Sequence, residues 1–270
     1  MKFIDIVSFE RISVFLLILF RISAFLLSAP IFGSAYVPAR TKIGLSLLLS
    51  VILLPIVEKG DFSPPKELLT YGIVVFREVM VGVIIGYSAR LVFVGIDFAG
   101  QAIGLQMGFG IANIIDPKYE IQISIIAQFQ GFVAILIFLC INGHHWLLQA
   151  LAKSFETIPL SGFAVSPLGR PLFFAYSEEA VAILLKMSSD IFVVAFKIGA
   201  PVIVALFLTN VTLGVLTKAV PRMNVFFMSF PLTIIIGLLS LAASLQILGY
   251  LLPKIFHQMQ NDIVTLIGIL

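Results

Sequence analysis

The chain has 270 residues, of which 60% are hydrophobic and only 11% are charged. An ordinary soluble domain is about half apolar and about a quarter charged, so this composition excludes a freely soluble globular protein. It predicts an integral membrane protein, or one that partners bury on most sides. The net charge of +3 comes from 17 basic and 14 acidic residues. Because the basic residues are scattered singly between apolar runs, we expect them to anchor helix ends and expect no binding of nucleic acid.

Apolar runs separated by charges and prolines predict an all-α membrane protein of about six helical segments, several of them kinked and arranged in hairpins. The runs cover residues 12–32, 43–57, 68–115, 121–143, 181–217 and 223–253. Residues 58–67 and 161–179 carry prolines and charges and are predicted to be loops. Charged residues in and around the first run break the pattern of a signal peptide, so we expect a retained first helix.

Two of these runs are too long for one membrane span. A bilayer core of about 30 Å needs about 20 helical residues, and residues 68–115 and 181–217 are each much longer. Either they break into hairpins, at glycines in the first run and at Gly199 and Pro201 in the second, or they project beyond the membrane. Successive helix ends show no clear alternation of Lys and Arg, so the positive-inside rule predicts no orientation.

Seven charged residues lie inside or beside the apolar runs: Arg21, Arg77, Glu78, Arg90, Asp97, Asp190 and Lys197. Each would cost about 2.5 to 3.5 kcal/mol at a bilayer centre, so we expect them to meet one another, water or a neighbouring subunit. Arg90 and Asp97 are seven residues apart and share a helical face, as do Asp190 and Lys197. Since roughly 10 Å separates such positions, their partners must come from other helices. Structural ion pairing and an ion pathway are both open, and the lack of several His or carboxylates at one depth favours pairing.

The sequence contains no recognisable pattern for catalysis or metal binding. His144 and His145 are adjacent and therefore point about 100° apart on a helix, while His257 is isolated and Cys140 is the single cysteine. The chain lacks a phosphate-binding glycine loop, a nucleophile elbow and a credible pair of carboxylates in a polar cleft. We therefore expect no enzymatic activity, no metal site and no cofactor.

The stretch at 100–117, GQAIGLQMGFGIANIIDP, is unusual inside so hydrophobic a chain. Gly100, Gly104 and Gly108 are four residues apart, so in a helix they would share one face and let another backbone approach closely. The glycines at 108 and 110 weaken the helix by about 1 kcal/mol each, and the residue before Pro117 is disfavoured in helical geometry. Irregular backbone at membrane depth is tolerated only inside protein or along a water-filled cavity. The stretch therefore predicts a close-packing helical face followed by a pore lining, gate or plug.

This glycine stretch resembles the signature region of the FliR family of flagellar biosynthetic export-gate proteins, whose injectisome homologues are called SctT. Three further blocks resemble the same family in the same order: FRISAFLLSAPIFGSAYVPARTKIGLSLLLS, FLCINGHHWLLQALAKSFETIPL and LFLTNVTLGVLTKAVPRMNVFFMSFPL. Four blocks in order cover almost the whole chain and are far more specific than one glycine motif. The departure from the family pattern is local, since His145 doubles the histidine of the NGH element.

The resemblance implies a channel-forming subunit of the type III export gate. FliR-like proteins join FliP and FliQ, work with FlhB and other export-apparatus proteins, and pass unfolded flagellar subunits across the bacterial inner membrane at the flagellar basal body. Their helices wind into a right-handed assembly that contacts membrane lipid. By this resemblance residues 1–270 form one domain, with a FliP-like part at about 1–175 and a FliQ-like helical hairpin at about 180–253.

The resemblance also assigns the plug of the closed channel to the glycine stretch. The implied plug residues are Gln106, Met107, Gly108, Phe109, Gly110, Ile111, Asn113, Asp116 and Pro117. Met107, Phe109 and Ile111 are the expected apolar stoppers.

Two alternatives stay open. The virulence injectisome homologue shares this fold, although the closeness of the four blocks favours the flagellar system. A small-solute secondary transporter would also contain broken helices and intramembrane charges. The transporter alternative predicts a stable monomer with a binding site near the membrane midplane. It also predicts an internal repeat, but the two halves of the chain do not align.

Overall fold

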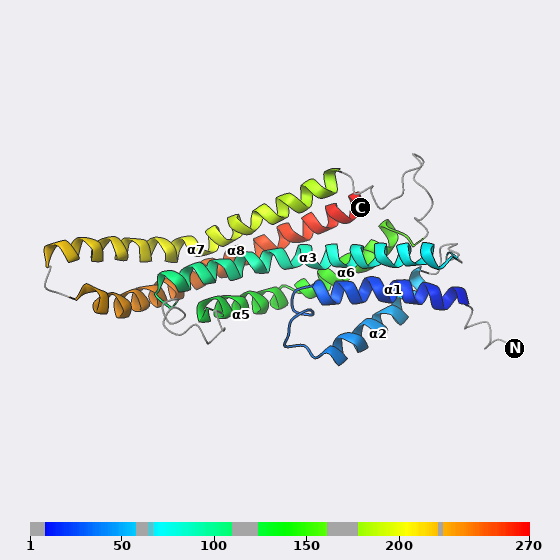
Figure 1. Ribbon diagram of the computed structural model, residues 1–270, viewed down its shortest axis with the longest axis horizontal. Helices are drawn as coiled ribbons and strands as arrows, with labels where there is room; N and C mark the ends of the chain where they lie inside the picture. Colours follow the sequence, from blue (N-terminus) through cyan, green and yellow to red (C-terminus); the bar gives the residue numbers. More distant parts are fainter. Residues whose placement is uncertain (1–8, 58–64, 66, 110–123, 161–177, 221–223) are drawn as a thin grey trace. The chain divides into compact units, whose positions relative to one another are not determined.

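The computed structural model describes residues 9–57, 65, 67–109, 124–160, 178–220 and 224–270 (Figure 1). Within these ranges every regular element is an α-helix, which confirms the predicted all-α class. In chain order the helices are α1 (Phe9–Ser28), α2 (Ala39–Val57), α3 (Leu68–Gln106), α5 (Ile125–Cys140), α6 (Gly143–Thr157), α7 (Glu178–Ala219) and α8 (Val225–Ile269).

Five of the described helices, α1, α2, α3, α7 and α8, are long and apolar enough to cross a membrane. The pair α5 and α6, bent by 68° at a short break, supplies a sixth span if the pair is counted as one. Many large apolar side chains on these helices point outward, among them Leu185 and Phe196, which are 66% and 71% exposed. A surface of this kind is stable against lipid or other apolar helices, so the chain is a multi-pass membrane protein.

The three longest helices run without interruption. α3 has 39 residues, α7 has 42 and α8 has 45, so α3 alone is about 60 Å long at about 1.5 Å per residue. Of the two alternatives, breakage into hairpins is therefore wrong for the described parts of both long runs. α8 also continues past Pro253, where the sequence predicted its end. Proline is tolerated inside membrane helices because neighbouring groups satisfy the carbonyl that it leaves free.

The break between α5 and α6 has a local cause. Ile141 ends α5 by donating its N–H to the carbonyl of Ile137 at 3.0 Å. Asn142 then adopts a left-handed conformation, with φ of 58° and ψ of 29°. Asparagine enters this region more readily than most residues, and one left-handed residue is enough to redirect the chain before α6 begins.

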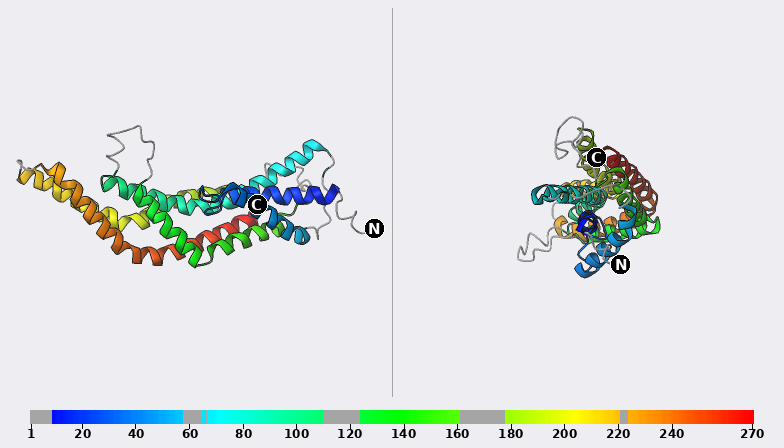
Figure 2. Two further views of the ribbon diagram at one scale, coloured as in Figure 1. Left: turned by 90° about the horizontal axis from the view of Figure 1, so that it is seen from below. Right: turned by 90° about the vertical axis from the view of Figure 1, so that its right-hand side faces the viewer.

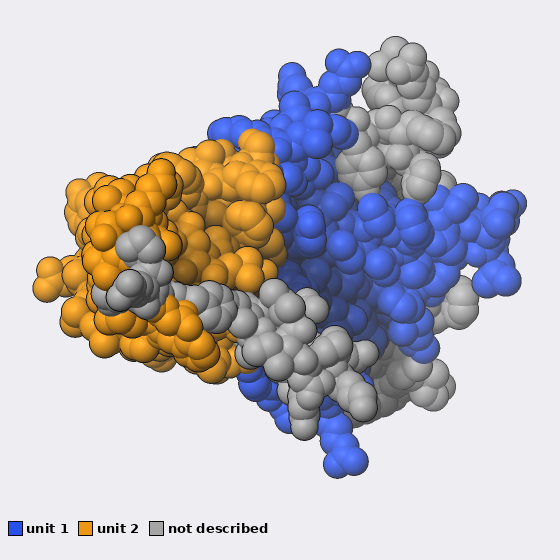
Figure 3. Space-filling model, turned by 60° about the vertical axis from the view of Figure 1, so that its left-hand side comes forward, with its two compact units in different colours: residues 1–91, 142–188, 258–270 blue, residues 92–141, 189–257 orange. Residues whose placement is uncertain are grey.

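Contacts group the chain into two compact units, which Figure 3 distinguishes by colour. Unit 1 contains residues 1–91, 142–188 and 258–270, and unit 2 contains residues 92–141 and 189–257. Each unit is assembled from separate stretches of chain, and α3, α7 and α8 each contribute residues to both. The units follow contacts along the helices, so the division into FliP-like and FliQ-like parts stays a prediction.

In unit 1, α1 lies against the N-terminal part of α3, as the blue and cyan ribbons show (Figures 1 and 2). The closeness depends on glycine, because a Cβ at Gly82 would overlap the carbonyl oxygen of Arg21. At Gly86 a Cβ would overlap the hydroxyl of Ser28. The glycines expected to break α3 instead allow a second backbone to approach it.

In unit 2, the adjoining parts of α7 and α8 lie side by side in both views, drawn in yellow and orange (Figures 1 and 2). One part of the core of this unit is aromatic. Phe93, Phe138 and Phe256, from α3, α5 and α8, have ring centroids 5.0 to 5.6 Å apart. This spacing lies within the favourable range for edge-to-face and tilted rings, so the three rings join these helices.

Candidate functional site

The glycine stretch begins as helix and leaves it at a defined place. Gln106 is the last residue of α3, and the next three residues form a turn. In that turn the N–H of Gly108 donates to the carbonyl of Leu105 at 3.1 Å, and the N–H of Phe109 donates to that of Gly104, also at 3.1 Å. Gly108 has φ of +92°, in the left-handed region where only glycine is unstrained. Glycine at this position therefore allows the chain to turn out of the helix.

Gly100 and Gly104 lie where α3 meets the start of α5. A Cβ at Gly100 would overlap the backbone of Ala127, and one at Gly104 would overlap the hydroxyl of Ser124. Ser124 is also the N-cap of α5, since its hydroxyl accepts the N–H of Ala127, and it donates to the carbonyl of Gly100 at 3.4 Å. Two of the three spaced glycines thus bring α5 against α3.

Gly108 does not belong to this helical face, so the expectation of a three-glycine face is wrong at its third position. The residue follows the end of α3, and a Cβ there would lie 3.0 Å from the ring of Phe230 on α8. The reason is geometric, because positions four apart share a face only while the helix continues.

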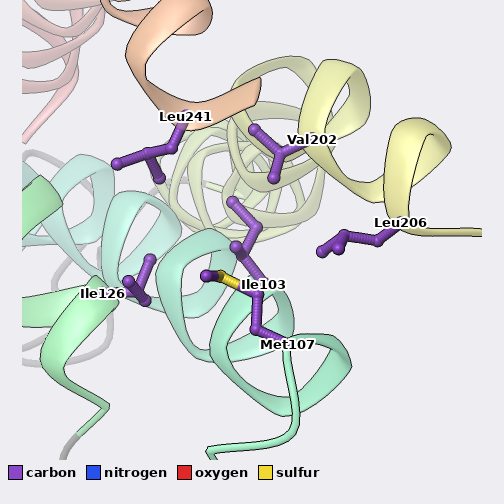
Figure 4. Close-up of a cluster of buried hydrophobic side chains, with 6 residues drawn as sticks. All are labelled: Ile103, Met107, Ile126, Val202, Leu206 and Leu241. Atoms are coloured by element: carbon purple, nitrogen blue, oxygen red, sulfur yellow. The ribbon is translucent and has the colours of Figure 1, made fainter. Parts of the chain in front are cut away.

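Met107 is buried in the core of unit 2. Figure 4 shows its side chain among apolar residues from the end of α3, the start of α5, and α7 and α8. The cluster consists of Ile103, Met107, Ile126, Val202, Leu206 and Leu241, and Phe109 packs against it. Met107 has 0% exposure. Met107 is one of the three expected apolar stoppers. In this structure it packs inside the protein instead of lining an opening.

Two residues of α8 contact Met107 directly. The hydroxyl of Thr233 lies 3.3 Å from the carbonyl oxygen of Met107, and its shorter hydrogen-bond contacts are to the carbonyls of Ser229, at 2.9 Å, and Phe230, at 3.1 Å, in its own helix. At Gly237 a Cβ would lie 2.7 Å from both Cγ and Cε of Met107. Sequence reasoning missed both contacts, because a glycine and a threonine more than a hundred residues away carry no signal for this packing.

The remaining residues of the predicted plug are described only in part. Gln106 is exposed at the end of α3, and Phe109 is half-buried. The predicted plug residues Gly110, Ile111, Asn113, Asp116 and Pro117 lie outside the described residues.

Three of the seven predicted intramembrane charges form one buried network in unit 1. Nε of Arg21 and Oε2 of Glu78 are 2.6 Å apart, and both side chains have 0% exposure. Arg77, which is 14% exposed, reaches the other carboxylate oxygen of Glu78 at 2.8 Å. One carboxylate is therefore shared by two guanidinium groups, an arrangement in which the charge-assisted hydrogen bonds are strong.

The two arginines also hold the end of α6. Arg21 donates to the carbonyl oxygens of Ser154 and Ile158, each at 2.9 Å, and Arg77 donates to that of Pro159 at 3.0 Å. The last carbonyls of a helix lack partners inside the helix and carry partial negative charge. The network has one more positive than negative charge, and this excess faces the negative C-terminal end of α6. The network therefore links α1, α3 and α6 at one place.

The other four predicted charges are on the surface of the described chain. Arg90, Asp97 and Lys197 are exposed and Asp190 is half-exposed. Asp97 accepts a hydrogen bond from the side-chain amide of Gln101, one turn along α3, at 2.7 Å. Among the described residues none of the four is in an ion pair. The expected partners on other helices are thus not found within the described chain, and a neighbouring subunit stays the predicted source of them.

The described residues contain no group of three His, Cys, Asp or Glu side chains that could hold a metal ion. His144 and His145 contact each other, with ring centroids 4.2 Å apart. The described part of the candidate site consists of packed helices at the end of α3 and the start of α5.

Comparison with known proteins identifies relatives along nearly the whole chain. Residues 12–259 match the model of the family described as bacterial export proteins, family 1. The chain is similar to the flagellar biosynthetic protein FliR of Bacillus subtilis (strain 168), with 32% identity over 259 residues, covering 94% of this chain and 96% of the relative. It is also similar to the proteins of that name from Escherichia coli (strain K12), 29% identical over 250 residues, and Aquifex aeolicus (strain VF5), 29% identical over 257 residues. These alignments cover 93% of this chain in both cases, and 91% and 93% of the relatives.

Proposed function

Because the chain belongs to the bacterial export proteins of family 1, we propose that it is the FliR-type subunit of a flagellar type III export gate. The family and the names of the relatives make it a component of flagellar export. In the proposal it forms, with FliP, FliQ and FlhB, the channel that passes unfolded flagellar proteins across the bacterial inner membrane at the flagellar basal body. The observation that carries the proposal is the similarity along almost the whole chain to proteins named FliR.

Two features of the structure support a role within an assembly. The long helices expose many large apolar side chains, and two of them, α3 and α7, carry the four surface charges, which a lone span in lipid would hold only at a cost. Both features are explained if neighbouring subunits cover these surfaces in a right-handed helical assembly. In the same proposal the hairpin of α7 and α8 is the FliQ-like part, and the preceding helices are the FliP-like part.

Co-expression with FliP and FliQ is expected to give one detergent-stable complex, and expression alone is expected to give a lower yield of folded protein. The physical reason is the apolar surface that partners would cover. Affinity purification of the chain followed by size-exclusion chromatography measures both quantities. A well-behaved monomer that binds a small solute and does not purify with either partner would favour a secondary transporter and end the export-gate proposal.

We also propose that the segment following α3 closes the channel as a plug. Shortening the chain within residues 110–117, which leaves Met107 in the core, is expected to let small ions leak through the assembled gate. The measurement is passive ion entry in cells that express all gate subunits, with equal amounts of complex verified by purification. An equal shortening within residues 58–64, a predicted loop elsewhere, serves as the control and should leave the membrane tight. Background ion entry in the first variant, with assembly intact, would contradict the plug.

The four surface charges are proposed to pair with neighbouring subunits. Replacing Lys197 with glutamine is then expected to lower the yield of the complex, because removing one partner of a buried pair costs about 3 to 5 kcal/mol. Lys153→Gln, which neutralises an exposed lysine on α6, is the matched control. Equivalent replacements of Arg90, Asp97 and Asp190 extend the test. If all four leave the yield of complex unchanged, these charges do not pair across subunits.

A further inference from the structure

We propose that the outer face of α2 lies against the acyl chains of the lipid bilayer, and that α2 fixes the depth of unit 1 in the membrane. The outer face consists of the exposed residues that follow the first turn of α2: Ile43, Gly44, Leu47, Leu48, Val51, Ile52, Pro55 and Ile56. α2 packs against α1 and touches α6, all within unit 1. Even so, only 11% of its apolar stretch is buried, against 50% for α1. Most of α2 therefore needs a covering that the described chain does not supply.

The polarity of α2 is the reverse of that of a helix on a water-soluble protein. Its buried residues are Ser46 and Ser50, which are 4% and 0% exposed, whereas Leu48 and Val51 are 58% and 59% exposed. The two serine hydroxyls donate to carbonyls of their own helix, those of Ile43 at 2.8 Å and Ser46 at 2.6 Å. The outer face therefore carries no side-chain donor or acceptor, and hydrocarbon can cover it without leaving a polar group unpaired.

The sizes of the side chains on α2 favour acyl chains over a second protein helix. Helix–helix interfaces in membranes are enriched in small residues, which let two backbones approach closely. On α2 the small residues Ser46 and Ser50 are turned inward. Gly44, where an added Cβ would have no atom within 4 Å, is the exception at one end of the outer face. The rest of that face is branched aliphatic side chains and Pro55, which hold another backbone at a distance and leave gaps that flexible acyl chains can fill.

The exposed face of α7 in unit 2 is of a different kind. It contains the rings of Phe192 and Phe196, 65% and 71% exposed, and the charge of Lys197. At Gly214 an added Cβ would have no atom within 4 Å, so a second backbone has room to approach there. Aromatic rings are enriched in protein interfaces, and a charge that faces lipid is costly. By these criteria α7 fits a neighbouring subunit, and α2 fits lipid.

The length and the charges of α2 match one bilayer. Its 19 residues measure about 28 Å at about 1.5 Å per residue, close to a hydrocarbon core of about 30 Å. Arg40, in the first turn, is exposed at one end of the helix, where a guanidinium can bind headgroup phosphates. The three longest helices exceed one core thickness, so their length selects no level in the bilayer. Displacing α2 along the membrane normal would instead expose apolar turns to water or draw Arg40 into the core.

The test places a nitroxide spin label on the outer face of α2 in the complete gate, assembled with its partner subunits and reconstituted into phosphatidylcholine vesicles. The label is attached to Leu48→Cys after Cys140, which is exposed, has been replaced by serine and the cysteines of the partners have been replaced likewise. Electron paramagnetic resonance measures how often the label collides with oxygen, which dissolves among acyl chains, and with a nickel chelate, which stays in water. Oxygen collisions are expected to exceed nickel collisions several-fold.

Two results of this measurement would overturn the proposal. Low access to both reagents would mean that a protein covers the outer face of α2. High access to the nickel chelate would mean that water covers it. Val51→Cys, on the same face, takes the place of Leu48→Cys if that variant does not fold.

Labels at the two ends of the outer face test the depth of α2. The ratio of oxygen to nickel collisions is expected to be highest at Leu48, in the middle of the helix. It should be several-fold lower for Ile43→Cys and Ile56→Cys, which lie nearer the ends of α2 and thus nearer the headgroups. Equal ratios at all three positions would contradict the assigned depth.

A label at Phe196→Cys on α7 separates this proposal from the export-gate proposal. In the assembled gate this label is expected to collide with oxygen several-fold less often than the label at Leu48, because a neighbouring subunit covers it. Oxygen collisions that are equally frequent at both positions would contradict the subunit contact and would still support lipid at α2.

Discussion

Replacing Glu78 with alanine is expected to lower the free energy of unfolding by about 3 to 5 kcal/mol, a large part of the stability of a domain. The carboxylate is fully buried between Arg21 and Arg77. Without it, the positive charge of Arg21 stays buried among two carbonyl groups, the Ser154 hydroxyl and the ring of Phe155, none of which can neutralise it. The thermal unfolding midpoint of the purified protein or complex in detergent measures the loss.

The matched control for this prediction is Glu156→Ala on α6. Glu156 is exposed, and surface substitutions of this kind change stability by about 0.5 kcal/mol or less. Replacing Arg21 and Glu78 together by methionine and leucine is expected to recover part of the loss, because it removes the fully buried charge of Arg21, while Arg77, which is 14% exposed, keeps the carbonyl of Pro159 as an acceptor. An unfolding midpoint that Glu78→Ala leaves equal to that of the control would mean that the network does not stabilise the fold.

Replacing Gly100 with alanine is expected to destabilise the protein by about 1 to 3 kcal/mol, although alanine is the better helix former. The reason is that the new Cβ would overlap the backbone of Ala127, which cannot rotate away as a side chain can. α5 would have to move from α3, and Ser124 would lose its contact with the carbonyl of Gly100. The unfolding midpoint is again the measurement.

Gly72→Ala supplies a control of opposite sign on the same helix. Gly72 is exposed and an added Cβ there has no atom within 4 Å, so the substitution should stabilise α3 by up to about 1 kcal/mol. The two variants differ only in what surrounds one methyl group. If both raise the unfolding midpoint, the contact between α3 and α5 is looser than the structure shows.

Most helices could be predicted from the sequence, because apolar runs and interrupting charges act locally, but α6 (Gly143–Thr157) lies outside the predicted runs apart from its first residue. The end of α3 near Gly108 followed from glycines and the nearby Pro117 for the same reason. The length of α3 did not follow, since Gly82 and Gly86 looked like breaks. Whether a glycine ends a helix or receives a neighbour depends on what packs against it, and the sequence does not display the neighbour.

The candidate site shows the same limit at the level of single contacts. The cost of burying charge predicted that Arg21 and Glu78 need partners, but it could not predict that they pair with each other. Arg21 also donates to backbone carbonyls at the end of α6, which every residue possesses. The contact of Met107 with Gly237 could not be predicted for a related reason, because it depends on the side chain that glycine lacks.

The buried position of Arg21 has a consequence for the order in which the protein is made. Glu78 follows Arg21 by 57 positions in the chain, and Ser154 follows it by 133. At a synthesis rate of about 5 to 20 residues per second, Arg21 leaves the ribosome roughly 3 to 11 s before its carboxylate and roughly 7 to 27 s before the carbonyl of Ser154. During that interval α1 carries an unpaired arginine in an apolar segment. The first helix can thus take its final place only after the nascent chain has delivered α6.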